Sequence, residues 1–174
     1  MRVPASSPYF SEEDIEWVIE RFKKILRGES YLSMGKYGDE FEKQFSRYIG
    51  TKYAVACSSG TSSLEMIFRG LNIQGKEVII PSNTFIATAL SVINAGGIPV
   101  FCECESNLCI NRIDVERKIT KNTAAVVVVH IGGLVSATVL DVKILCEEND
   151  LFLVEDAAQA HGSGLNGVRA GRFG

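Results

Sequence analysis

The sequence lacks an excess of basic residues, and it lacks any long apolar run. Its 174 residues carry a formal net charge of −3, whereas a protein that binds nucleic acid usually presents a basic face. The longest apolar run, Ala124 to Val129, is far shorter than a membrane span. Residues Met1 to Phe10 contain no apolar core of a signal peptide. We therefore expect no nucleic-acid partner and no membrane segment, and we predict a cytoplasmic protein.

The cysteines lack the spacing of a disulfide framework, and their number is odd. This pattern favours a reducing compartment and buried, reduced thiols. Cys102 and Cys104 share one face of a predicted strand, and with Cys109 they form a weak candidate for a metal site. Small buried thiols are the better interpretation. The five cysteines are Cys57, Cys102, Cys104, Cys109 and Cys146.

Two familiar motifs are missing, and a third is present only in part. No G-x-G-x-x-G sequence follows a predicted strand, and no G-x-S-x-G turn of a serine hydrolase occurs. Residues Gly70 to Lys76 have the spacing of a phosphate loop, with Phe152 to Asp156 as a candidate acidic strand. However, Glu77 stands where a hydroxyl ligand of magnesium belongs, and the segment ends a helix instead of opening one. A P-loop nucleotidase is therefore the weaker rival.

Apolar residues for a core are abundant. With 46% hydrophobic and 22% charged residues, the chain is long enough for a globular domain. Residues 1–50 predict a helical segment. Ser11 and Asp14 resemble a capping box at the start of a first helix, and a loop from Gly28 to Gly38 leads to a second helix. Gly50 ends that second helix.

Residues 51–174 predict an α/β domain, because short apolar strands alternate with amphipathic helices. The strands are continuous apolar runs, as expected when helices cover both faces of a parallel sheet. We therefore predict a doubly wound, mostly parallel sheet. The expected strands are Tyr53–Cys57, Glu77–Ile80, Ile98–Cys102, Ala124–His130 and Phe152–Glu155, and the expected helices lie near Leu64–Leu71, Phe85–Ala95, Asp114–Ile119 and Val139–Glu148.

The segment from Gly162 to Gly174 holds five of the 16 glycines and no predicted strand or helix cap. We expect from this composition that the chain is cut within its large domain. A sheet without its later strands would expose an edge and apolar faces, and we therefore expect self-association.

Candidate chemistry lies just past the predicted strands, where an open α/β sheet presents its functional groups. Ser58 to Ser63 places a glycine and several hydroxyls between a strand and a helix. Unpaired N–H groups at the positive end of the helix dipole would form an anion site. An ordinary helix N-cap explains the same residues. Both interpretations stay open at this point.

Asp156 follows the last strand, where a carboxylate is costly unless a cation or a hydrogen-bond donor meets it. A protonated pyridine nitrogen is such a partner, and the acid would keep that ring an electron sink. The alternative is a carboxylate that caps a following helix. Gln159 lies one predicted helical turn after Asp156, so both would face one ligand.

Two rings complete the set of candidates. Phe85 follows Pro81 and Ser82, where its ring either stacks on a flat ligand or packs in the core. His161 is either a base or a packed ring, and packing is the favoured interpretation.

Together these segments resemble the DegT/DnrJ/StrS family of sugar aminotransferases, which depend on pyridoxal 5'-phosphate (PLP). The most diagnostic stretch runs from Glu155 to Gly162. The supporting stretches are Tyr31–Gly35 with Phe41 and Glu42, Lys52–Ala56, Ala95–Phe101, Val129–His130 and Gly167–Gly171.

The resemblance implies a fold type I enzyme with a large α/β domain, a small C-terminal domain and active sites at the interface of a homodimer. The implied reaction moves an amino group, with glutamate as the expected donor, to the keto carbon of a nucleotide-linked sugar through a pyridoxamine phosphate (PMP) intermediate. Products of such reactions enter surface polysaccharides, glycans or antibiotic sugars. The resemblance implies that Gly60 and Thr61, with Ser62, hold the cofactor phosphate and that Phe85 stacks on the cofactor ring. It also implies that Asp156 pairs with the ring nitrogen and that the Gln159 amide approaches the ring hydroxyl.

One family residue cannot be placed. In relatives, the lysine that forms a Schiff base with the cofactor follows a sequence like Arg172-Phe173-Gly174, and no lysine of this chain occupies that position. We therefore expect these 174 residues alone to be inactive. A few relatives carry histidine at that position and dehydrate a deoxysugar instead, so this alternative stays open. A noncatalytic remnant or regulatory module stays open as well.

Overall fold

The computed structural model describes residues 8–174, and the chain divides into two compact units, residues 1–44 and residues 45–174. The first unit contains helix α1 (Glu12–Leu26) and most of helix α2 (Lys36–Ile49). The predicted capping box of α1 is confirmed: Ser11 Oγ accepts from the Asp14 N–H, and the Asp14 carboxylate accepts from the Ser11 N–H. α2 begins at Lys36, inside the predicted loop from Gly28 to Gly38.

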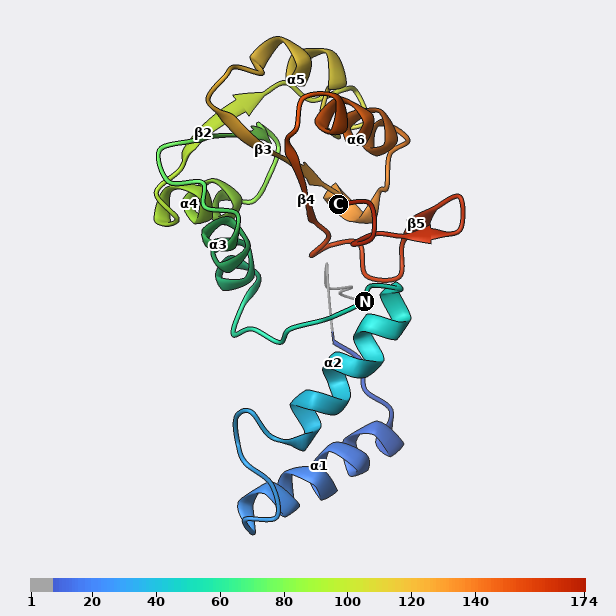
Figure 1. Ribbon diagram of the computed structural model, residues 1–174. Coiled ribbons are helices and arrows are strands. Elements are labelled where there is room, and N and C mark those ends of the chain that lie inside the picture. The colour runs from blue at the N-terminus through green and yellow to red at the C-terminus, as the bar shows by residue number, and fades with distance from the viewer. Residues whose placement is uncertain (1–7) are drawn as a thin grey trace, which may run out of the picture. The chain divides into compact units, whose positions relative to one another are not determined.

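The second unit contains a parallel four-stranded sheet in the spatial order β2-β1-β3-β4 (Figure 1). From β1 the chain moves outward to β2, returns to β3 on the other side of β1, and continues to β4. This order confirms the predicted doubly wound sheet. The strands are β1 (Glu77–Pro81), β2 (Ile98–Cys102), β3 (Thr123–Val129) and β4 (Phe152–Asp156).

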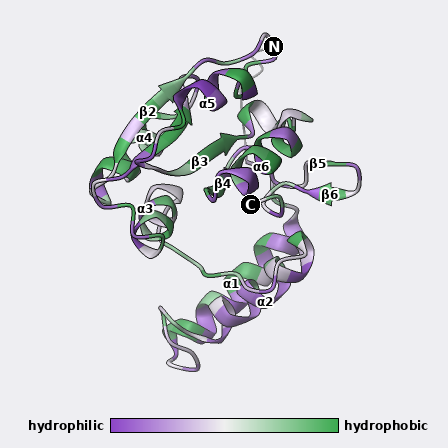
Figure 2. Ribbon diagram, turned by 45° about the horizontal axis from the view of Figure 1, so that its top comes forward, coloured by the Kyte–Doolittle hydropathy of each residue, from purple (hydrophilic) through white to green (hydrophobic). Residues whose placement is uncertain are grey.

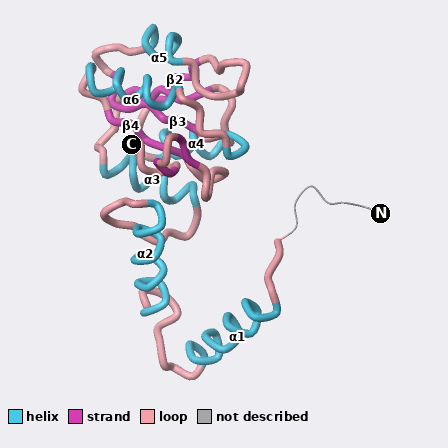
Figure 3. Tube along the Cα trace, turned by 90° about the vertical axis from the view of Figure 1, so that its right-hand side faces the viewer, coloured by secondary structure: helices cyan, strands magenta, loops and turns pink. Residues whose placement is uncertain are grey.

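Helices cover both faces of this sheet, as the tube in Figure 3 shows. On one face, Ile80 and Val127 pack with Phe68 of α3 and with α4. On the other face, Ile79 and Val126 pack against α5 and α6. Alternate residues of each strand therefore supply two separate cores, and Figure 2 shows β3 as hydrophobic ribbon. The helices are α3 (Gly60–Gly70), α4 (Ile86–Asn94), α5 (Arg112–Lys118) and α6 (Thr138–Glu148).

The predicted first strand, Tyr53–Cys57, is wrong for the described part of the chain. Within residues 8–174 this segment pairs with no strand, and the side chains of Tyr53 and Val55 are 72% and 76% exposed. An apolar run becomes a strand only where another strand offers its free N–H and C=O groups. No strand edge of this sheet lies against these residues.

The glycine-rich end of the chain also differs from the prediction. We expected no strand after Gly162, but β5 (Gly164–Leu165) and β6 (Val168–Arg169) form a short antiparallel hairpin. Asn166 and Gly167 both have positive φ, at 52° and 79°. This is the turn conformation that joins two strands by a two-residue loop, and Asn-Gly is a preferred sequence for it.

The cysteines are reduced, and three of the five are buried as predicted. Burial raises the pKa of the Cys102 thiol to about 12 and that of the Cys146 thiol to about 11. Cys57 and Cys104 are only half-buried, which corrects the prediction for these two. Residues 8–174 contain no group of three or more metal-ligating side chains. No helix in the same range is long and apolar enough to span a membrane.

Candidate active site

A pocket of about 240 Å³ lies at the carboxyl ends of β3 and β4. Parallel strands end at the same edge, and the pairing of Val129 with Asp156 brings these two strand ends together. The pocket brings together five of the six residues to which the family resemblance gives a role in binding the cofactor. They are Gly60, Thr61, Phe85, Asp156 and Gln159.

Ser62, the sixth residue, is not among those that line the pocket. Its N–H donates to Ser59 Oγ at 3.1 Å, and its hydroxyl lies 3.1 Å from Ser58 Oγ and 3.0 Å from Ser59 Oγ. The hydroxyl is therefore engaged within the serine cluster that opens α3. A phosphate contact from Ser62 stays a prediction.

The beginning of α3 confirms the N-cap interpretation of the serine-rich segment, and the anion site stays a prediction. Ser59 is the N-cap, with extended φ and ψ of −163° and 163°, and its carbonyl accepts from the Ser63 N–H. Among the described residues, no acceptor meets the N–H groups of Gly60 and Thr61. These two donors lie at the positive end of the helix dipole and line the pocket.

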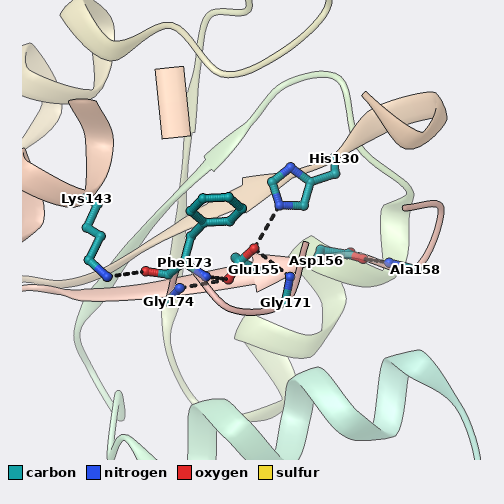
Figure 4. Close-up of polar contacts among 8 residues, drawn as sticks. All are labelled: His130, Lys143, Glu155, Asp156, Ala158, Gly171, Phe173 and Gly174. Carbon is teal, nitrogen blue, oxygen red and sulfur yellow. Dashed lines mark hydrogen bonds and ion pairs between the residues drawn. The ribbon is translucent and has the colours of Figure 1, made fainter. Parts of the chain in front are cut away.

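Asp156 presents its carboxylate to the same pocket. Its Oδ1 accepts from the Ala158 N–H at 3.2 Å, and its Oδ2 accepts from the Thr88 hydroxyl at 3.1 Å (Figure 4 shows the Ala158 contact). The alternative that Asp156 caps a helix is wrong, because the following residues form turns.

The predicted helical turn from Asp156 to Gln159 is wrong for the same reason, yet both side chains reach the pocket. The side-chain oxygen of Gln159 accepts from the Gly132 N–H at 2.6 Å. This bond fixes Gln159 against the turn that follows β3.

The two rings have different surroundings. Phe85 is the N-cap residue of α4, lines the pocket and is 69% exposed, so the core interpretation is wrong. His161 does not line the pocket. Its ring stacks on Phe45 at 5.7 Å and on Tyr48 at 5.3 Å between centroids. These stacking contacts support the favoured interpretation of His161 as a packed ring, and the residue stays exposed to solvent.

Comparison with known proteins identifies the family. A model of the DegT/DnrJ/EryC1/StrS aminotransferase family matches residues 12–174. The chain belongs to this family.

Individual family members are similar in sequence and in structure. The GDP-perosamine synthase of Vibrio cholerae is 41% identical over 144 residues, which are 82% of this chain and 39% of that protein. The X-ray structure of an aminotransferase from Psychrobacter cryohalolentis has a TM-score of 0.85 at 30% identity, covering 96% of this chain and 42% of its own. NtdA from Bacillus subtilis with bound cofactor PMP has a TM-score of 0.81 at 29% identity, covering 97% and 40%.

The chain spans about two fifths of the length of these relatives, which corresponds to 39–42%. Its fold is that of the large domain of fold type I PLP-dependent sugar aminotransferases.

The pocket of this family member has a donor set that fits PLP. Two unpaired N–H groups at a helix N-terminus suit a phosphate. An exposed phenyl ring suits a flat heterocycle, and a carboxylate with a donor on each oxygen retains acceptor capacity for a ring N–H. Among the described residues, no lysine lines the pocket.

Three polar residues of the pocket were not assigned a role from the sequence: Thr84, Thr88 and His130. Each had a detectable signal. His130 directly follows the apolar run of β3, and the two threonines are spaced by four residues across the start of α4. A search for polar residues at strand ends and helix starts would find these three residues, but it would also find many residues that only pack in the core.

His130 belongs to a buried network centred on Glu155 (Figure 4). The side chains of His130 and Glu155 are 1% and 4% exposed, and Nε2 lies 2.9 Å from Oε2. Glu155 also accepts from the backbone N–H groups of Gly171 at 2.8 Å, Gly174 at 2.7 Å and Phe173. One carboxylate therefore ties β3, β4 and the last turn of the chain together.

The charge state of Glu155 follows from these contacts. Burial acts to raise the pKa of Glu155, but the His130 hydrogen bond and the N–H groups of Gly174 and Gly171 outweigh it. The pKa is therefore lowered from its usual value of 4.5. An ionised carboxylate only accepts hydrogen bonds, so His130 Nε2 carries the proton between them.

We expect Glu155→Gln to lower the free energy of unfolding by about 3–5 kcal/mol at neutral pH, because it leaves a buried network with mismatched donors. Glu155 contributes this stability above pH 4.5, and the contribution is lost as the pH falls through its lowered folded pKa. Denaturant titrations from pH 3 to pH 7 measure the difference. Glu147→Gln, on the exposed side of α6, is the control. If the difference in the free energy of unfolding between wild type and Glu155→Gln stays constant from pH 7 to pH 3, this role of Glu155 is contradicted.

Proposed function

We propose that this chain provides the cofactor-binding half of an enzyme that transfers an amino group to the keto carbon of a nucleotide-linked sugar. The observation that carries the proposal is the convergence in one pocket of the Asp156 carboxylate, the exposed Phe85 ring and the unpaired N–H groups of Gly60 and Thr61. The relation to GDP-perosamine synthase supports a nucleotide-linked sugar as the substrate class. The NtdA structure with PMP supports the cofactor.

The roles of the residues follow from their positions. The N–H groups of Gly60 and Thr61 bind the cofactor phosphate, whose negative charge the dipole of α3 stabilises. Phe85 stacks on the cofactor ring and limits its tilt. The Asp156 carboxylate accepts a charge-assisted hydrogen bond from the protonated ring nitrogen.

When bound, PLP and its PMP form supply the amine carrier and the electron sink for the transfer. Gln159 lines the same pocket as Asp156, and its side-chain oxygen accepts from Gly132, so its amide N–H₂ group is free to donate to the ring hydroxyl. The protein's own contribution is therefore to orient the ring and to keep its nitrogen protonated.

The remaining parts of the proposal concern partners. Glutamate is the proposed amino donor, and the products are amino sugars for surface polysaccharide, glycan or antibiotic synthesis. We propose a homodimer in the cytoplasm. The first unit supports self-association, because Tyr31, Leu32 and Met34 are 82%, 81% and 97% exposed in one loop.

The acid is tested by Asp156→Asn in the full-length enzyme. We expect a loss in kcat of about 10- to 100-fold, because a neutral amide does not stabilise the ring-nitrogen cation as a carboxylate does. Transfer from glutamate to a nucleotide-linked keto sugar is followed by mass spectrometry of the sugar. Asp141→Asn, exposed on α6, is the matched control. A wild-type enzyme that aminates no such sugar would refute the proposed function.

The phosphate site is tested by Gly60→Pro. Proline is tolerated at the first position of a helix, and the extended Ser59 has the conformation that a residue before proline adopts. The substitution removes one N–H donor and should weaken PMP binding about tenfold, as measured by fluorescence titration. Gly60→Ala keeps the N–H, and its Cβ would meet nothing within 4 Å, so its affinity should stay unchanged. Equal affinities for the proline and alanine variants would remove Gly60 from the site.

The missing lysine is tested with residues 1–174 alone. We expect no turnover and no stoichiometric labelling after incubation with PLP and reduction with borohydride, because no lysine among the described residues lines the pocket. Peptide mapping by mass spectrometry detects any labelled lysine. A single stoichiometric site together with turnover would show that a lysine of this chain serves the reaction.

A further inference from the structure

The carboxylate of Asp156 is held by a second residue that lies deeper in the protein. Thr88, on α4, is fully buried, and its hydroxyl lies 3.1 Å from Asp156 Oδ2. The Thr84 hydroxyl lies 2.8 Å from that of Thr88. Both threonines line the same pocket as Asp156. The two hydroxyls and the carboxylate therefore form a chain of hydrogen bonds across the start of α4.

The chemistry of this chain fixes its direction. An ionised carboxylate has no proton to donate, so the single proton of the Thr88 hydroxyl points to Asp156. Thr88 Oγ1 then acts as the acceptor for Thr84, whose hydroxyl must donate. The Ala158 N–H holds the other carboxylate oxygen at 3.2 Å. Each oxygen of Asp156 thus has one fixed donor, and the carboxylate can rotate only by breaking one of them.

We infer that Thr88, supported by Thr84, is a positioning residue that keeps the Asp156 carboxylate aimed at a cationic ring nitrogen in the pocket. This inference rests on the proposed function. A carboxylate held in line with the ring N–H stabilises the protonated ring nitrogen through a charge-assisted hydrogen bond. Without the hydroxyl, the carboxylate is free to turn away and stabilises the protonated ring nitrogen less well.

The role of Thr88 requires a ligand with a ring nitrogen. PMP has one and needs no lysine to bind, whereas benzyl phosphate has a phosphate and a ring but no nitrogen. Loss of the Thr88 hydroxyl should therefore weaken the binding of PMP and leave the binding of benzyl phosphate unchanged. A collapsed pocket would weaken both, so the pair of probes separates positioning from structural damage.

The experiment compares Thr88→Val with Thr88→Ser in the full chain. We expect Thr88→Val to bind PMP about tenfold more weakly, as measured by calorimetry, and to bind benzyl phosphate with unchanged affinity. The absorbance titration of bound PMP should show the ring nitrogen losing its proton at a pH about one unit lower. Thr88→Ser keeps the hydroxyl and should restore both properties.

Two further variants complete the test. Thr84→Val removes only the outer donor and should have a smaller effect than Thr88→Val. Thr138→Val is the matched control, because Thr138 is also a buried helix threonine, and its hydroxyl contacts Ser136 and Glu105 instead of the pocket. Its PMP affinity should equal that of wild type.

The outcomes distinguish this inference from the proposed function. Suppose that wild type binds PMP. If Thr88→Val then binds PMP equally well, or loses affinity for both PMP and benzyl phosphate, the positioning role of Thr88 is refuted while the proposed function stands. If wild type fails to bind PMP, the proposed function is refuted, and the role of Thr88 is refuted with it.

Discussion

The end of β4 is the constraint on which the site depends, because two adjacent carboxylates leave this strand toward opposite faces of the sheet. Successive residues of a strand alternate in direction. Glu155 therefore joins the face that contains Phe173, and Asp156 joins the face covered by α4, where Thr88 meets it. The same alternation places Val154 in the core beneath α3 and α4. A single strand thus separates a structural acid from the acid that we propose for the cofactor site.

The two acids differ in what surrounds them. Glu155 has four donors within the protein, from His130 and from three backbone N–H groups, and no acceptor capacity faces the pocket. Asp156 has two donors, one on each oxygen, and borders the pocket. The saturated carboxylate stabilises the connection between β3, β4 and the chain end. The Asp156 carboxylate, with only one donor on each oxygen, retains the capacity to accept a hydrogen bond from a cation, which is the property a cofactor site requires.

Much of the fold could be predicted because burial on both faces leaves a clear pattern in the chain. The central residues of β1, β2, β3 and β4 are mostly apolar, and β1, β2 and β3 are each followed by a helix. The failure at Tyr53–Cys57 has a physical cause. Apolar, β-branched composition describes what a segment can bury, but a strand also needs a neighbour with free hydrogen-bonding groups. Only the arrangement of the other strands determines whether such a neighbour exists.

The helical turn used to place Gln159 does not form, and Ser62 does not line the pocket. The sequence by itself indicated Gly60, Thr61, Phe85 and Asp156 through their positions at predicted strand ends and helix starts, and these four residues line the pocket. These positions follow from local periodicity and chain order. Tertiary structure alone decided that Thr88 lies against Asp156, 68 residues away in the chain, and that His130 is hydrogen-bonded to Glu155. Such contacts depend on how α4 and β3 pack beside β4. Packing is a property of the whole core and leaves no local pattern in the sequence.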